Sequence, residues 1–248
     1  MENAYDAWSA DGLSDSSVHR HAADLRSALS FANRRGYAVG ETAGRAMAPP
    51  QPQSTAKAVT AADLPKLLNA AQTFGHDMEA AICLAATTGA RRGEITGLRW
   101  GDIDLEAGTV HIERQAVVVR GVVTIEDTKT SAQYTVRLSP ADVVFLTGVL
   151  HPRGSDMYVI GAGANPVNPD RITDGFTSVR GLAHVRGVTF QSLRHYWTTS
   201  MLDANVPVKD VASGRWSSDR MAREVYGRHA TVAGSDRMAG VALLPAAR

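Results

Sequence analysis

The sequence predicts a mostly α-helical protein that contains a small antiparallel β-sheet. Apolar residues recur at helical spacing near both ends of the chain, whereas short β-branched runs alternate with turn residues in the middle. In addition, residues 48–57 carry three prolines and break the periodic patterns on either side. We therefore predict a short helical module at residues 1–47, a linker at 48–57 and a larger domain at 58–248.

The N-terminal module is expected to contain one amphipathic helix. Asp15 or Ser16 can cap this helix, because either side chain can accept a hydrogen bond from an amide of the first turn. The apolar face of the helix comprises Val18, Ala22, Leu25, Leu29 and Ala32.

The larger domain is expected to begin with two helices. Thr60 can cap the first, which contains Leu64 and Leu68, and Gly89 ends the second, at about residues 78–87. The expected strands contain residues 110–112, 117–119, 122–125 and 134–138. Further helices are expected at residues 140–150, 170–182, 189–202, 208–213 and 219–228, followed by an apolar tail at 232–244.

Composition limits the class of protein. With 44% hydrophobic residues the chain can bury a sizeable core, and its single cysteine, Cys83, cannot form a disulfide or a cysteine-based zinc site within one chain. No apolar run approaches the roughly 18 residues of a membrane helix, so no membrane partner is expected. From Arg171 onwards, eleven Lys or Arg accompany six Asp or Glu. This bias suits DNA, and it fits a solvated arginine-rich face equally well.

The segment that follows the second helix has the features of a phosphate-binding turn. Gly89 allows the chain to turn sharply, so that the planar guanidinium of Arg91 can offer paired donors to a phosphate. Glu94 can hold this arginine or cap the following helix. Leu98 and Trp100 are expected in the core.

Three further segments carry candidate residues. Lys129 lies between two strand-like runs, Arg194 and His195 lie on an expected helix, and Tyr226 lies near the C-terminus. Each residue alone is adequately explained as an ordinary surface or half-buried side chain. Their order along the chain favours a functional interpretation.

The segment from Thr88 to Asp104 resembles the first arginine motif of the tyrosine recombinases, T-G-x-R-x-x-E-x-x-x-L-x-W-x-D-I-D. Gln191-Ser-Leu-Arg-His195 resembles the second motif, commonly H-x-L-R-H, and Arg223-Glu-Val-Tyr-Gly-Arg-His229 resembles the tyrosine helix of this family. The resemblance to the family, which includes the phage integrases, covers about residues 58–229. It implies a tyrosine-recombinase catalytic domain preceded by a short helical core-site DNA-binding module.

The resemblance also implies a set of catalytic residues, namely Arg91, Lys129, Arg194, Trp216 and Tyr226. Tyr226 would attack DNA to form a 3′-phosphotyrosine, while Lys129 would protonate the departing 5′ oxygen. The two arginines would stabilise the phosphate, with Glu94 and His195 as supporting residues. Because the phosphotyrosine conserves the bond energy, neither a metal nor a cofactor is required.

The sequence departs from the family pattern at three positions. Gln191 replaces the first histidine of the second motif, and glutamine can hydrogen-bond a phosphate oxygen but cannot take a proton. Trp216 stands close to where the family has a histidine before its tyrosine, and an indole N–H is also a single donor. Arg215 replaces a glycine, which leaves the local turn unspecified.

By resemblance, the expected function is site-specific recombination that integrates or excises a mobile genome in a bacterial cytoplasm. The expected partners are double-stranded attachment-site or core-site DNA, further copies in a homotetramer, and accessory directionality proteins or host DNA-bending proteins. The apolar tail is expected to dock on its own domain or on a neighbouring protomer.

Three other functional classes are alternatives to recombination. One alternative is a catalytically impaired DNA-binding relative, which Gln191 and Arg215 favour, and another is an enzyme like the type IB topoisomerases. A helix-turn-helix regulator would leave the ordered Arg, Lys, Arg and Tyr set unexplained.

Overall fold

A computed structural model describes residues 2–38, 57–127, 133–161, 163–212 and 240–246. The chain divides into two compact units, Met1–Thr55 and Ala56–Arg248. Residues 48–56 of the predicted linker and the predicted helix at 219–228 lie outside the described residues.

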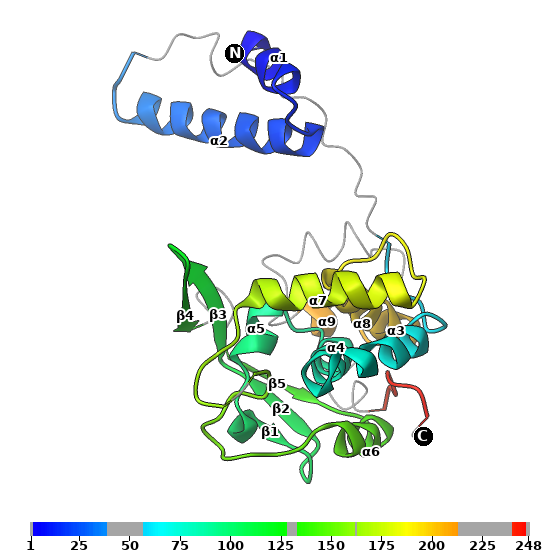
Figure 1. Ribbon diagram of the computed structural model, residues 1–248. Coiled ribbons are helices and arrows are strands. Elements are labelled where there is room, and N and C mark those ends of the chain that lie inside the picture. Colours follow the sequence, from blue (N-terminus) through cyan, green and yellow to red (C-terminus); the bar gives the residue numbers. More distant parts are fainter. Residues whose placement is uncertain (1, 39–56, 128–132, 162, 213–239, 247–248) are drawn as a thin grey trace. The chain divides into compact units, whose positions relative to one another are not determined.

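The described part of the N-terminal unit, residues 2–38, contains two helices, α1 (Glu2–Ala10) and α2 (Asp15–Arg34), which pack around a small core (Figure 1). That core consists of Tyr5, Val18 and Ala22, with Trp8 and Leu13 packed against it. The sequence did not predict α1, because its nine residues show little apolar periodicity apart from the two aromatic residues.

The predicted cap of α2 was wrong by one or two residues. Ser14 is the N-cap, with an extended backbone, and its hydroxyl accepts a hydrogen bond from the Ser17 amide at 3.3 Å. Asp15 is already the first helical residue, where its carboxylate favours the positive end of the helix dipole.

The C-terminal unit is built around α4 (His76–Thr88), whose last eleven residues are buried. A helix that is apolar on all sides is stable only inside a domain. Accordingly, α4 contacts α3 (Leu64–Ala71), α6 (Pro140–Val149), α7 (Pro169–Leu182) and α8 (Gln191–Asp203) (Figure 1).

Short elements complete this unit. They are η2 (Gln72–Phe74), α5 (Arg92–Gly97), η3 (Trp100–Asp102) and α9 (Val208–Ala212). The predicted Thr60 cap was wrong, because α3 begins at Leu64 with Asp63 as its N-cap. The Thr60 hydroxyl accepts a hydrogen bond from the Asp63 amide at 3.2 Å in the turn before the helix. Among the described residues, no helix is both long enough and apolar enough to cross a membrane.

The sequence predicted a single antiparallel sheet, but the described residues form two antiparallel sheets. One has the order β1-β2-β5, formed by β1 (Ile103–Asp104), β2 (Thr109–Ile112) and β5 (Tyr134–Arg137). The other is the hairpin of β3 (Arg114–Val119) and β4 (Val122–Asp127). The chain places β5 against β2, with Ile112 opposite Tyr134, rather than against the hairpin that precedes it in sequence.

The end of the chain docks on its own domain. Leu243 and Leu244 are buried, and their amides donate to the carboxylate of Asp142 on α6, with shortest distances of 2.9 Å and 2.7 Å. The Tyr196 hydroxyl on α8 donates to the Leu243 carbonyl at 2.7 Å. Burial raises the pKa of Asp142 above its ordinary value. Residues 240–244 of the predicted apolar tail thus contact their own domain, and residues 232–239 of that tail lie outside the described residues.

Replacing Asp142 by alanine should destabilise the C-terminal unit. The change leaves two buried amides without their acceptor, so we expect Asp142→Ala to lower the free energy of unfolding by about 2 to 3 kcal/mol. Urea denaturation measures this loss, with Asp174→Ala, at an exposed position of α7, as the matched control. Equal small changes in both variants would show that Asp142 does not anchor the chain end.

Candidate active site

The candidate active site is organised by the turn that follows α4. Gly89 adopts a left-handed backbone, with a φ of 63°, and its amide donates to the Ala85 carbonyl at 3.0 Å. A Cβ atom at this position would lie 2.8 Å from the indole ring of Trp197 on α8. Position 89 therefore requires glycine both for its backbone conformation and for the close approach of α8.

Arg91 is the N-cap residue of α5, and two hydrogen bonds connect it to Glu94. The Glu94 carboxylate accepts a hydrogen bond from the Arg91 amide at 2.7 Å and from its Nη1 at 2.9 Å. Glu94 thus performs both roles expected of it, as a cap of α5 and as a support for the arginine. The Glu94 side chain is 1% exposed and that of Arg91 is 39% exposed. The Arg91 guanidinium is therefore held by Glu94 and is partly exposed to solvent.

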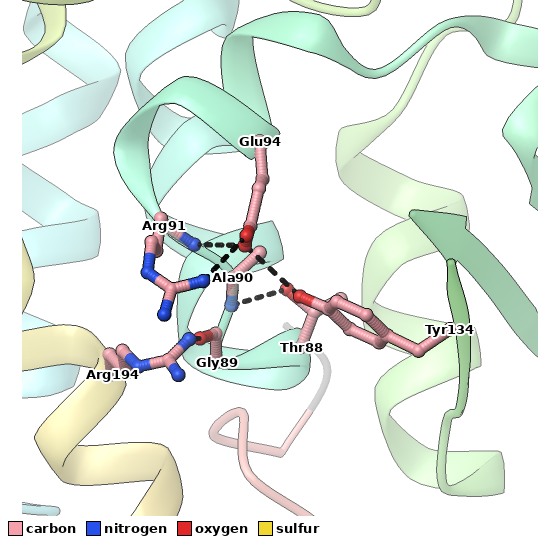
Figure 2. A network of polar contacts seen from close by, with 7 residues as sticks. All are labelled: Thr88, Gly89, Ala90, Arg91, Glu94, Tyr134 and Arg194. Carbon is pink, nitrogen blue, oxygen red and sulfur yellow. Dashed lines mark hydrogen bonds and ion pairs between the residues drawn. The ribbon is translucent and has the colours of Figure 1, made fainter. Parts of the chain in front are cut away.

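Arg194 joins the second sequence motif to the first. It lies in α8 and is 3% exposed, and its Nη1 donates to the Gly89 carbonyl at 2.6 Å. Figure 2 shows the guanidinium groups of Arg91 and Arg194 at the same turn. Two residues separated by more than one hundred positions in sequence are therefore brought to one place. We call Arg91, Glu94 and Arg194 the arginine cluster.

The remaining residues of the second motif lie on α8. Gln191 is the first residue of the helix and is exposed, three positions before Arg194. His195 is half-buried, and burial lowers its pKa, as does the neighbouring positive charge of Arg194. Because the ordinary value is already 6.5, the neutral imidazole predominates at pH 7.

The structure therefore brings together Arg91, Glu94 and Arg194, and His195 is the residue after Arg194 in α8. The three other predicted catalytic residues, Lys129, Trp216 and Tyr226, lie outside the described residues.

Two residues of this region were not predicted from the sequence. Tyr134 donates from its hydroxyl to Glu94 at 3.0 Å (Figure 2). Trp197 packs on Gly89. In sequence, Tyr134 gave only a strand signal and Trp197 only that of an apolar helix residue.

The charge of the arginine cluster suits a phosphodiester. Two guanidinium groups meet one buried carboxylate, so the cluster carries a net positive charge, and a guanidinium presents donors in a plane that matches phosphate oxygens. The described residues contain no group of three or more His, Cys, Asp or Glu side chains that could hold a metal ion.

Comparisons with known proteins agree with this fold. The model of the phage integrase family matches residues 57–232. A XerC-like tyrosine recombinase of Caldanaerobacter subterraneus subsp. tengcongensis is 24% identical over 167 residues, which are 56% of this chain and 42% of the relative. The chain thus matches less than half the length of this relative.

Solved structures of integrases share the fold. The integrase of transposon Tn1549, in complex with transposon right end DNA, is similar with a TM-score of 0.71 and 16% identity, over 95% of this chain and 81% of that one. A lambda integrase dimer bound to a core site gives a TM-score of 0.61 and 19% identity, over 89% and 61%. The integrase of mycobacterium phage Brujita gives 0.55 and 19%, over 97% and 77%.

The mostly α fold with small antiparallel sheets matches that of a tyrosine-recombinase catalytic domain. Since the family model covers well over half of the 248 residues, this chain belongs to the phage integrase family.

The lowered pKa of His195 predicts a pH dependence of stability. A lowered folded-state pKa means that the folded chain binds fewer protons than the unfolded chain, so this contribution is present above pH 6.5 and lost as the pH falls through the folded-state value. We expect the free energy of unfolding of the wild type, relative to His195→Gln, to rise with pH below 6.5 and to be constant above it.

Urea denaturation of the two proteins at several pH values between about 5 and 8 checks this expectation. His184→Gln, at an exposed position, is the matched control. The same pH trend in both variants would contradict the assignment to His195.

Proposed function

We propose that this chain is a site-specific DNA recombinase that cleaves and rejoins DNA strands through a 3′-phosphotyrosine. The observation that carries the proposal is the hydrogen bond from Arg194 to the Gly89 carbonyl, which brings both motif arginines to one turn. Membership of the phage integrase family supports it. So do the names of the similar proteins, one a tyrosine recombinase and others integrases solved with DNA.

In the proposed reaction, Arg91 and Arg194 bind the nonbridging oxygens of the scissile phosphate. The phenol of Tyr226 has an ordinary pKa near 10, and two adjacent positive charges favour its phenolate. The Tyr226 oxygen attacks phosphorus, and the bond from phosphorus to the 5′ oxygen breaks. The same arginines stabilise the added charge of the pentavalent transition state.

The other family positions complete the proton balance. Lys129 donates a proton to the departing 5′ oxygen, and the 5′ hydroxyl of a second strand later reverses the step. Trp216 donates a further hydrogen bond to the phosphate from its indole N–H. Gln191 can contribute its amide, but it cannot accept the proton of Tyr226, which passes to water.

The proposed substrate is double-stranded DNA that carries attachment or core sites. Residues 1–47 form the core-site binding module, 48–57 the linker and 58–248 the catalytic domain. In the module, Arg20, Arg34 and Arg35 are exposed on or beside α2, as DNA backbone contacts require. Integration or excision of a mobile genome takes place in a bacterial cytoplasm, by a homotetramer that works with directionality or DNA-bending proteins.

One observation favours a second function. Gln191 lies one helical turn before Arg194, at the place where the family has a histidine, so a chain that binds DNA without cleaving it is the alternative. The two functions differ in whether protein becomes covalently attached to DNA.

A nicked suicide substrate tests the proposal. It is built on the attachment site of the genetic element that encodes the chain, and adducts are resolved on a denaturing gel. We expect the wild type to form a covalent adduct and Tyr226→Phe to form none, because only the phenol oxygen attacks phosphorus. Tyr158→Phe, at a tyrosine outside both the binding module and the arginine cluster, is the matched control and retains the adduct.

Two results would overturn the proposal. Tight binding of the site without an adduct would make the chain the impaired relative. An adduct accompanied by relaxation of supercoiled plasmids that lack the site would make it an enzyme like the type IB topoisomerases.

A further inference from the structure

Tyr134 reaches the arginine cluster from a different part of the fold. It is the first residue of β5, whereas Arg91 is the N-cap of α5 and Glu94 lies in the first turn of α5. Its hydroxyl donates to Oε2 of Glu94 at 3.0 Å, and the same oxygen accepts the Arg91 amide at 2.7 Å. The other oxygen, Oε1, accepts Nη1 of Arg91 at 2.9 Å. Figure 2 shows Tyr134 and Arg91 on opposite sides of the Glu94 carboxylate.

The burial of Glu94 makes this hydroxyl consequential. The carboxylate is 1% exposed, so water cannot readily replace a lost donor, and an unsatisfied buried carboxylate oxygen is costly. Without the hydroxyl, Oε2 keeps the hydrogen bond from the Arg91 amide but loses the donor that lies outside α5, so the carboxylate is held less firmly against rotation. Any rotation moves Oε1, which is the oxygen that holds the guanidinium of Arg91.

Tyr134 is held by parts of the fold outside α5. Tyr134 pairs with Ile112 in the three-stranded sheet, and its ring packs against the main hydrophobic core. Ile112 is 1% exposed. The hydroxyl is therefore fixed by the sheet and not by the helix that it contacts, which gives Glu94 a reference point outside α5.

We propose that Tyr134 is a positioning residue that fixes the direction of the Arg91 guanidinium through Glu94. Tyr134 itself does not touch the DNA. Its effect on catalysis rests on the proposed function, because Arg91 matters to the rate only if it binds the scissile phosphate.

Tyr134→Phe removes only the hydroxyl and tests this role. We expect the rate of adduct formation in a single turnover to fall by about tenfold or more, because the hydroxyl bonds a charged group. DNA affinity, which depends on many phosphate contacts, should stay within about twofold. Tyr158→Phe is the matched control, since it removes a buried hydroxyl that pairs with Arg99, a residue outside the arginine cluster.

A double-mutant cycle separates positioning from general support of the fold. In an Arg91→Ala background the hydroxyl has no guanidinium left to direct, so Tyr134→Phe should cause no further loss of rate. An equal loss in both backgrounds, or an unchanged rate in Tyr134→Phe alone, would overturn the proposal.

A second measurement tests the positioning role of Tyr134 without DNA cleavage. In ¹⁵N-labelled protein, the Arg91 side-chain signals are assigned by their absence in Arg91→Lys. Rotation of the Arg91 guanidinium should be slow in the wild type and faster in Tyr134→Phe. If the wild type forms no adduct, the proposed function fails, but this rotation still tests the positioning role. Unchanged rotation would overturn that role.

Discussion

The arrangement of the site depends on the left-handed turn at Gly89. This turn ends the most buried helix of the domain, accepts a hydrogen bond from Arg194 at its carbonyl and leaves no space for a side chain beside Trp197. Because α8 approaches the turn so closely, the two arginine motifs of the sequence meet at one turn. The relative position of Arg91 and Arg194 is therefore set by the packing of α4 against α8.

A positively charged site in a folded core must be held without being neutralised. Glu94 achieves this by burying its carboxylate while the guanidinium that it holds stays partly exposed. Arg194 is almost fully buried, and its Nη1 donates to the Gly89 carbonyl, which is an uncharged acceptor. The burial that lowers the pKa of His195 keeps that imidazole neutral, so the positive charge stays on the two arginines.

Much of this was predictable from sequence, because periodic apolar residues and a glycine after a helix are local signals. Those signals predicted α4 and its end at Gly89. The position of Glu94, three residues after Arg91, predicted its two roles as helix cap and as support of the arginine. The two-sheet arrangement was not predictable, since pairing of β5 with β2 is a long-range choice. Tyr134 and Trp197 were missed for the same reason, because their roles arise from contacts with residues distant in sequence.

In the proposed reaction, the two arginines act together on the charge of one phosphate. Single-turnover adduct formation by Arg91→Ala and Arg194→Ala tests it when a normal scissile phosphate is compared with an uncharged methylphosphonate. We expect both variants to lose about 100-fold or more of the rate of adduct formation on the normal phosphate. On the methylphosphonate we expect a much smaller loss of rate, because this group has no negative charge to stabilise. Equal losses on both substrates would show that the arginines support the fold and not the reaction.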